Sequence, residues 1–264
     1  LFRSEGPAVP FVAAPTTAGT GTEATRNAVL GERGSAGYKR SFRHEALVPR
    51  WAVVDPDLLE GCPPELIAAD GMDALTQLLE AYVSIRANPF SDALAESGLL
   101  AARDGLLPWF EGTGDPRAAR ERMAWASLLS GIALAQAGLG AVHGLSPPLG
   151  SLFPIAHGVV CGTLVAAATE ANLRALGARA PGSPALAKYA RAAEILSGRP
   201  ARGEDLVELL GRWTERLRLP RLGSFGVAEA DLPRIVAGCR GASMRTNPVE
   251  LSDEEVAAIV RSRL

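Results

Sequence analysis

Two histidines and an upstream acid–amide pair are the residue types in this chain that could bind a metal. His143 lies in AVHGLSPPLG and His157 in FPIAHGV, and the 264-residue chain contains only 3 histidines. Asp73 and Gln77 are four positions apart, so on a helix both side chains would leave the same face. Imidazole and carboxylate are good metal donors, whereas an amide carbonyl is a weak one. One aspartate with two histidines leaves positions open for water or substrate and favours Fe²⁺ or Zn²⁺.

Each of these residues also has a purely structural interpretation. Apolar residues flank Asp73 and Gln77, which predicts that the pair lies near the core boundary, where a half-buried carboxylate needs a partner. A single buried histidine is usually a hydrogen-bonded core residue, but two in a histidine-poor chain favour metal ligation. The third histidine, His44 in FRHE, is predicted to lie on the surface.

The cysteines and serines give weaker signals. Cys62, Cys161 and Cys239 are widely spaced without a CxxC motif, which indicates reduced, structural cysteines and suits a cytoplasmic protein. Cys161 follows His157 by four residues and would share its helix face, but core packing is the favoured interpretation. Ser146 has no nucleophile-elbow motif around it.

A loop of small residues, PTTAGTGTE, follows the first apolar run of the chain. Gly19 and Gly21 would let its backbone approach a ligand closely, and threonine hydroxyls suit a pyrophosphate or ribose. The loop is neither a Walker loop nor a GxGxxG motif, so a plain turn explains its composition equally well.

The elements that must position these residues divide the chain at about residue 60. Before that point, VPFVAAP predicts a buried strand, and residues 50–54 predict a second β-like run that ends at Asp55-Pro56. After it, apolar residues recur at helical spacing. Helices are predicted at 63–86, 91–107, 116–137, 155–176, 184–197, 203–217 and 253–263, the last capped by Ser252. We therefore predict a mainly α protein with an α/β segment at 1–60 and a helical domain at 61–264.

Composition excludes several classes of partner. Hydrophobic residues make up 47% and charged residues 21%, the net charge is −2 and the pI is near 6.0, which gives no reason to expect nucleic acid or an anionic membrane. We find no apolar run of about 18 residues, so no membrane span is predicted. The stretch 124–142 comes closest, but its glycines and serines suit a buried helix. No signal peptide is visible, and the first residue, Leu1, suggests that a segment upstream is not included.

Four blocks of sequence carry a resemblance to a known family. They are APTTAGTGTEATRNAVL, WAVVDPDLLEGCPPELIAADGMDALTQLLEAYVS, AQAGLGAVHGLSPPLGSLFPIAHG and SMRTNPVELSDEE. In this order, they resemble the iron-containing (group III) alcohol dehydrogenases. The resemblance implies the dehydroquinate synthase-like fold, in which an α/β dinucleotide-binding domain and a helical domain hold a metal between them. The glycine-rich pyrophosphate loop of the family is not found here, so residues 1–60 would be a remnant of the nucleotide domain.

The resemblance also implies functional positions. Asp73, His143 and His157 fall on metal-ligand positions of the family. The dinucleotide, NAD or NADP, would be contacted by residues of the threonine loop: Thr16, Thr17, Gly19, Thr20 and Thr22. The implied reaction is metal-assisted hydride transfer between a small alcohol or aldehyde and nicotinamide, in a protein that is often a homo-oligomer.

Two departures from the family pattern leave alternatives open. Gln77 stands where such dehydrogenases carry a third histidine ligand, and Pro147 stands where many carry a histidine assigned to proton transfer. Loss of both would suit a metal-independent reductase of an oxo-acid, similar to maleylacetate reductases. The lack of the pyrophosphate loop would also suit a truncated, catalytically silent helical domain that binds metal.

Overall fold

The computed structural model describes residues 9–32 and 38–264, and it is mainly α-helical, as predicted. The helices of the described part are α1 (Pro64–Val83), α2 (Pro89–Glu111), α3 (Pro116–Ala137), α4 (Ala141–Leu152), α5 (His157–Arg179), α6 (Pro184–Ser197), α7 (Gly203–Arg216), α8 (Leu232–Gly238) and α9 (Asp253–Arg261). The strands are β1 (Val12–Ala13), β2 (Asn27–Glu32), β3 (Tyr38–Arg43) and β4 (Trp51–Ala52).

Helix boundaries follow local signals in the sequence. Helix α2 begins with Asn88 as its cap, which accepts hydrogen bonds from the backbone of Phe90 and Ser91, and it ends at Gly112 in the left-handed region (φ 66°). The predicted cap Ser252 accepts a hydrogen bond from the backbone N–H of Glu255 at the start of α9. Predicted and observed bounds coincide for α3 and α6, whereas α4 and α8 were not predicted.

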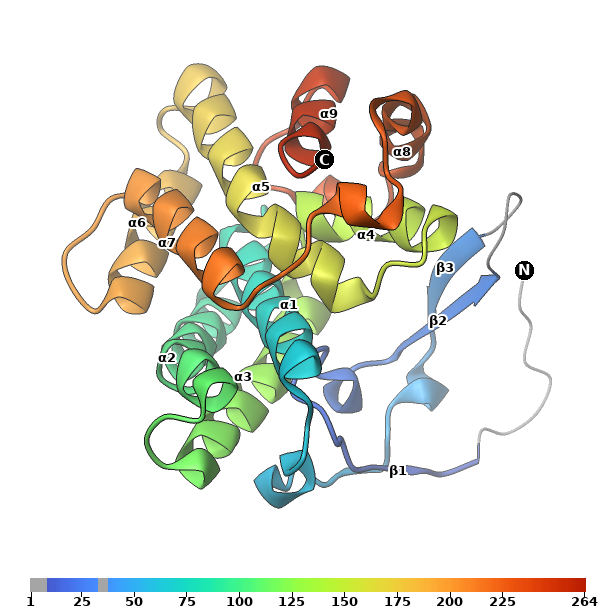
Figure 1. Cartoon of the computed structure of the whole chain (residues 1–264), viewed down its shortest axis with the longest axis vertical. Coiled ribbons are helices and arrows are strands. Elements are labelled where there is room, and N and C mark those ends of the chain that lie inside the picture. The colour runs from blue at the N-terminus through green and yellow to red at the C-terminus, as the bar shows by residue number, and fades with distance from the viewer. Residues whose placement is uncertain (1–8, 33–37) are drawn as a thin grey trace.

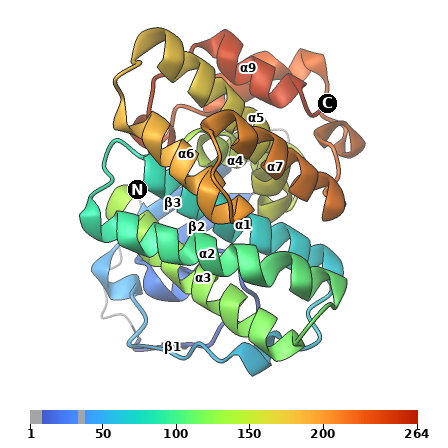
Figure 2. The ribbon, with the colours of Figure 1, turned by 90° about the vertical axis from the view of Figure 1, so that its left-hand side faces the viewer.

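Helix α1 is the central element of the protein. It packs against α2 and α3 on one side and against α5 on another, so that nearly all of its length is buried (Figure 1). Met72, Leu75 and Leu78 of α1 are fully enclosed. Figure 2 shows α2 and α3 side by side on one face, with α6 and α7 above them. Because its surroundings are apolar, any polar side chain on α1 must find a partner inside the protein.

The strands lie at one edge of the helical assembly (Figure 1). β1 and β4 form a two-stranded parallel pair, in which Val12 is opposite Trp51, and β2 and β3 form an antiparallel hairpin that contacts α4. The prediction of a buried strand at VPFVAAP was wrong about its burial, since Val12 is 55% exposed and Trp51 55% exposed. Nothing in the described part of the chain covers this pair, which is why its apolar side chains face outward.

Helix α5 is long and apolar enough to cross a membrane, and the pair α3–α4 would also pass this test if its 102° bend were ignored. The prediction from sequence placed the most apolar stretch at 124–142 and did not single out α5. Most of the apolar part of α5 is buried inside the protein, where the helix packs against α1, α4, α7 and α9. Burial in the core therefore accounts for its composition.

Candidate metal centre

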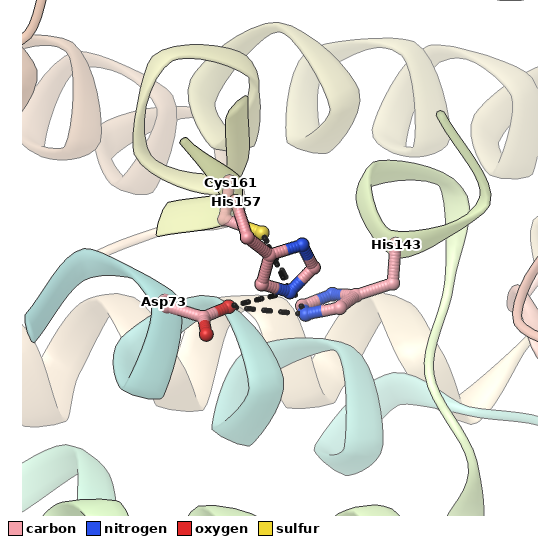
Figure 3. Close-up of side chains that lie close together, drawn as sticks. All are labelled: Asp73, His143, His157 and Cys161. Atoms are coloured by element: carbon pink, nitrogen blue, oxygen red, sulfur yellow. Dashed lines mark hydrogen bonds and ion pairs between the residues drawn. The ribbon is translucent and has the colours of Figure 1, made fainter. Parts of the chain in front are cut away.

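Four possible metal donors from three helices meet at one point. Asp73 comes from α1, His143 from α4, and His157 and Cys161 from α5, and their side chains point toward one another (Figure 3). One ligand atom from each lies within 4.8 Å of all the others. Oδ1 of Asp73 is 3.2 Å from Nε2 of His143 and 3.5 Å from Nε2 of His157. The structure thus brings together the three residues that the sequence singled out, and adds a thiol to them.

Close contact between α5 and α1 makes this convergence possible. Gly158, the second residue of α5, lies against the backbone of Ala69 on α1, and a Cβ atom there would be 2.4 Å from the Ala69 carbonyl oxygen. Any larger residue would hold the two helices apart. Because Gly158 has no side chain, α5 packs close to α1. His157 and Cys161, which flank Gly158 in sequence, can therefore reach Asp73.

Glu80 orients the His143 ring. Its Oε2 lies 2.7 Å from Nδ1 of His143, and its Oε1 accepts a 2.7 Å hydrogen bond from the backbone N–H of Val142. The carboxylate thus sits at the N-terminus of α4, where the helix dipole favours a negative charge. With Nδ1–H donating to Glu80, the lone pair of Nε2 is directed toward Asp73, which is the tautomer that a metal requires.

Ser146 contacts Nδ1 of His157 in the same way that Glu80 contacts Nδ1 of His143. Its hydroxyl lies 2.5 Å from Nδ1 of His157, and the serine is buried. When Nδ1–H donates to this hydroxyl, Nε2 of His157 faces Asp73 as a lone-pair donor. Neither Ser146 nor Glu80 was predicted to belong to the site. Glu80 could have been found, because Asp73, Gln77 and Glu80 occur at the i, i+4 and i+7 positions of one face within an apolar helix.

Gln77 adjoins the centre but its amide oxygen is directed elsewhere. That oxygen accepts a 3.0 Å hydrogen bond from the Ser130 hydroxyl, while the amide nitrogen lies 3.5 Å from Oδ2 of Asp73. The Thr20 hydroxyl donates to the same Oδ2 at 3.4 Å. Oδ2 is therefore held by hydrogen-bond donors, and Oδ1 faces the histidines.

The charges in this cluster depend on one another. Burial raises the pKa of the Asp73 carboxyl, but His157 and His143 outweigh burial and lower it below its usual range. Burial lowers the pKa of the His143 imidazole, whereas Cys161, Asp73 and Glu80 together raise it well above 6.5. Burial, with the Asp73 charge, raises the pKa of the Cys161 thiol to about 12. In the metal-free protein the centre is thus an imidazolium–carboxylate cluster with a neutral thiol.

The cluster forms one wall of an open cleft of 470 Å³. Gln77, His143, Ser146, Pro147 and His157 line it on the helical side. The opposite side consists of the hairpin β2–β3 and part of the threonine loop, with Thr20 and Thr22. The cleft therefore joins the metal donors to the loop that was predicted to contact a dinucleotide.

Two other residues of that loop, Thr17 and Gly19, contact Asp70 of α1. Thr16, Thr17 and Gly19 are not among the residues that line the cleft. Thr17 bonds to the Asp70 side chain, and a Cβ at Gly19 would lie 2.8 Å from Cβ of Asp70. Gly21, at φ 59°, has the same close fit against α3, since a Cβ there would be 2.2 Å from the Ser127 carbonyl oxygen. The glycines of the loop thus allow it to pack on the helices.

The donor set fits a divalent cation. Once a metal displaces their protons, two imidazole nitrogens, a carboxylate oxygen and a sulfur within 4.8 Å of one another can act as ligands, and such sets bind Fe²⁺ or Zn²⁺. The structure agrees with the predicted packing of Cys161 and also places its sulfur beside the two imidazoles. Its residue is fully buried, but its sulfur lies 3.6 Å from Nε2 of His143 and 3.8 Å from Nε2 of His157. Its spacing of four from His157 was the signal in the sequence.

Comparison with known proteins identifies relatives over nearly the whole chain. Residues 67–264 match the C-terminal model of the Fe-containing alcohol dehydrogenase family, and residues 2–56 match the model of iron-containing alcohol dehydrogenase. Alcohol dehydrogenase 4 of Schizosaccharomyces pombe is 33% identical over 264 residues, which is 99% of this chain and 60% of the relative. The 1-propanol dehydrogenase PduQ of Salmonella typhimurium is 35% identical over 266 residues, 96% of this chain and 69% of that protein.

Structural comparison gives the same result. The crystal structure of a 1,3-propanediol oxidoreductase superposes with a TM-score of 0.87 at 33% identity and covers 99% of this chain and 68% of the other. The chain spans only about 60–70% of the length of these relatives. The family models together match most of the sequence, and the fold agrees over almost all of it. The chain belongs to the iron-containing alcohol dehydrogenase family.

Proposed function

We propose that this chain carries the metal- and substrate-binding part of an NAD- or NADP-dependent oxidoreductase that interconverts a small alcohol and its aldehyde. The observation that supports this most strongly is the position of the donors. Asp73, His143 and His157 converge beside a cleft that is also lined by Thr20 and Thr22. In this proposal residues 61–264 form the metal- and substrate-binding domain, and residues 1–60 belong to the dinucleotide-binding domain.

Each residue of the centre has a defined task in this reaction. Asp73, His143 and His157 hold the cation, which when bound would polarise the substrate oxygen as a Lewis acid. Glu80 and Ser146 fix the two rings so that Nε2 of each faces the cation site. Thr20 and Gln77 hold the second oxygen of Asp73. Leu134 and Leu139 give the cleft an apolar part that would suit the carbon chain of a small alcohol.

Proton transfer must proceed without an imidazole at position 147. Pro147 lines the cleft and has no group that titrates. The hydroxyl groups that line the same cleft are those of Thr20, Thr22, Thr25, Ser41, Ser146 and Ser243. We therefore assign the exchange of the alcohol proton to water ordered by these hydroxyls, in contact with solvent at the open side of the cleft.

The proposal is tested on the chain restored to full length with a complete dinucleotide-binding domain, by nicotinamide reduction with propan-1-ol or 1,3-propanediol after loading with Zn²⁺ or Fe²⁺, together with a fluorescence titration with NADH. We expect NADH binding and metal-dependent turnover, and we expect Asp73→Asn to reduce turnover at least about 100-fold. Asp57→Asn, which alters an exposed carboxylate on the surface, is the matched control. Absence of both turnover and NADH binding with either metal would refute the proposal.

A further inference from the structure

We infer that Cys161 supplies the fourth metal ligand of this centre, in the place that Gln77 leaves, and that the site therefore prefers Zn²⁺ to Fe²⁺. The inference rests on the proposed metal site and deepens it, since it names the ligand that determines which cation is bound. It begins from the geometry of the sulfur relative to the other three donors.

The distances between donors match the edges of a tetrahedral site. With metal–sulfur bonds of about 2.3 Å and metal–nitrogen or metal–oxygen bonds of about 2.0 Å, sulfur–nitrogen edges are about 3.5 Å and nitrogen–oxygen edges about 3.3 Å. The sulfur of Cys161 lies 3.6 Å from Nε2 of His143 and 3.8 Å from Nε2 of His157. The same nitrogens lie 3.2 and 3.5 Å from Oδ1 of Asp73. These four edges are within about 0.3 Å of the tetrahedral values, and all four donor atoms lie within 4.8 Å of one another.

Gln77 is excluded from this set by its hydrogen bonds. Its amide oxygen, the atom that could ligate, accepts from the Ser130 hydroxyl. Its amide nitrogen has no lone pair to offer and faces the other oxygen of Asp73. The glutamine is therefore a positioning residue for the carboxylate.

The position of Cys161 in α5 keeps its sulfur at the site. Cys161 is one turn after His157, so both side chains leave the helix on the same face. The residue has no exposed surface, and the contact of Gly158 with Ala69 fixes the first turn of α5 against α1. On metal binding the thiol releases its proton to solvent and coordinates as thiolate.

The chemical consequence is a change in metal preference. A set of one thiolate, two imidazoles and one carboxylate is softer than a set of imidazoles and carboxylate alone. Tetrahedral sites with sulfur and nitrogen donors are typical of zinc, whereas Fe²⁺ favours nitrogen and oxygen donors. We expect the chain to retain zinc more tightly than iron when both are supplied at equal concentration.

Cobalt is the probe that tests this inference, since Co²⁺ replaces Zn²⁺ and reports a bound thiolate by a sulfur-to-metal charge-transfer band in the near ultraviolet. The 264-residue chain is titrated with Co²⁺ alone. We expect the band to reach its maximum at one equivalent, to vanish in Cys161→Ser, and to persist in Gln77→Ala. Cys239→Ser, at a cysteine that is equally buried but outside the cluster, is the matched control and should keep the band.

The outcomes separate this inference from the proposed function. Binding of one Co²⁺ without the band, or an unchanged spectrum in Cys161→Ser, would overturn the role of Cys161 and leave the other three ligands in place. Failure of the wild-type chain to bind Co²⁺ would overturn both. Because Cys161→Ser could impair folding, X-ray absorption of the zinc-loaded wild type gives a second test: one sulfur at about 2.3 Å is expected, and a shell of nitrogen and oxygen alone would contradict it.

Discussion

Replacing Gly158 by alanine should disrupt the metal centre through a helix contact and without changing a ligand. The added Cβ would be 2.4 Å from the carbonyl oxygen and 2.6 Å from the carbonyl carbon of Ala69. Ordinary contact requires about 3.4 Å or more, so the first turn of α5 must move by about 1 Å. His157 and Cys161 move with it, and the edges that join them to donors on other helices, now 3.5 Å to Asp73 and 3.6 Å to His143, would grow beyond the span of one cation.

The change in stability is best measured against a second glycine on the same helix. Gly177 of α5 has no atom within 4 Å of its would-be Cβ, so alanine there gains helix propensity, up to about 1 kcal/mol, without steric cost. Alanine at Gly158 would share that gain but also incur overpacking of about 1–3 kcal/mol. The propensity effect largely cancels in the difference, so Gly158→Ala should be less stable than Gly177→Ala by about 1–3 kcal/mol.

Urea unfolding of the metal-free chain measures this difference, and competition with a chromophoric chelator measures zinc affinity. We expect zinc affinity to fall at least about 100-fold in Gly158→Ala and to stay within about twofold of wild type in Gly177→Ala. Equal zinc affinity in the two variants would refute the argument that the contact between α5 and α1 assembles the site. Equal stability would show that the contact yields without cost.

Three further predictions concern charge. Zinc affinity should rise at least about tenfold per pH unit between pH 6 and 8, because the pKa of His143 is raised and the metal must displace its proton. Affinities measured by chelator competition that do not change with pH would contradict this. Without metal the sign reverses, since the stability that protonated His143 contributes is present below its unfolded pKa near 6.5 and is lost as pH rises through the higher folded value. Glu80→Gln should weaken zinc binding about 10- to 100-fold, whereas Glu96→Gln on α2, the control, should leave it unchanged; similar affinities would exclude the orienting role of Glu80. Burial, aided by Asp73, raises the pKa of Asp70 to about 6. In urea unfolding, Asp70→Asn should therefore be more stable than wild type by about 1–2 kcal/mol at pH 7.5 and equally stable near pH 3.5. Equal stability at both pH values would contradict the raised pKa.

Helices could be predicted from the sequence wherever local signals agree with packing. Proline at the start and polar caps delimit α3 and α6, and their bounds were predicted to the residue. Helix α4 was missed because Pro147 and Pro148 lie inside it and remove two backbone donors, which argues locally against a helix. Burial of side chains such as Leu145 and Leu149, neither of which has exposed surface, overrides that local cost.

The β-segment shows the opposite error. The run around Val12 is apolar, and periodicity alone cannot distinguish a strand that is covered from one that is open. In the described part of the chain the parallel pair β1–β4 has no third strand and no covering helix, so Val12 and Trp51 are exposed. The hairpin β2–β3 was not predicted either, although it forms one side of the cleft.

The residues of the centre differ in how far the sequence alone could assign them. His143 and His157 attracted notice because histidine is scarce in this chain and is a common metal ligand, and both lie at the centre. Cysteine is equally scarce here but usually packs in cores, and glutamate occurs on any helix, so only the contacts among α1, α4 and α5 give Cys161 and Glu80 a role. In the sequence, the replacement of the family's third histidine ligand by Gln77 on α1 and the presence of the Cys161 thiol on α5 look unrelated. They become alternatives for one ligand position only when the distances from the sulfur to both imidazoles are known, and the contact at Gly158 holds the helix that carries the sulfur against α1 and Asp73.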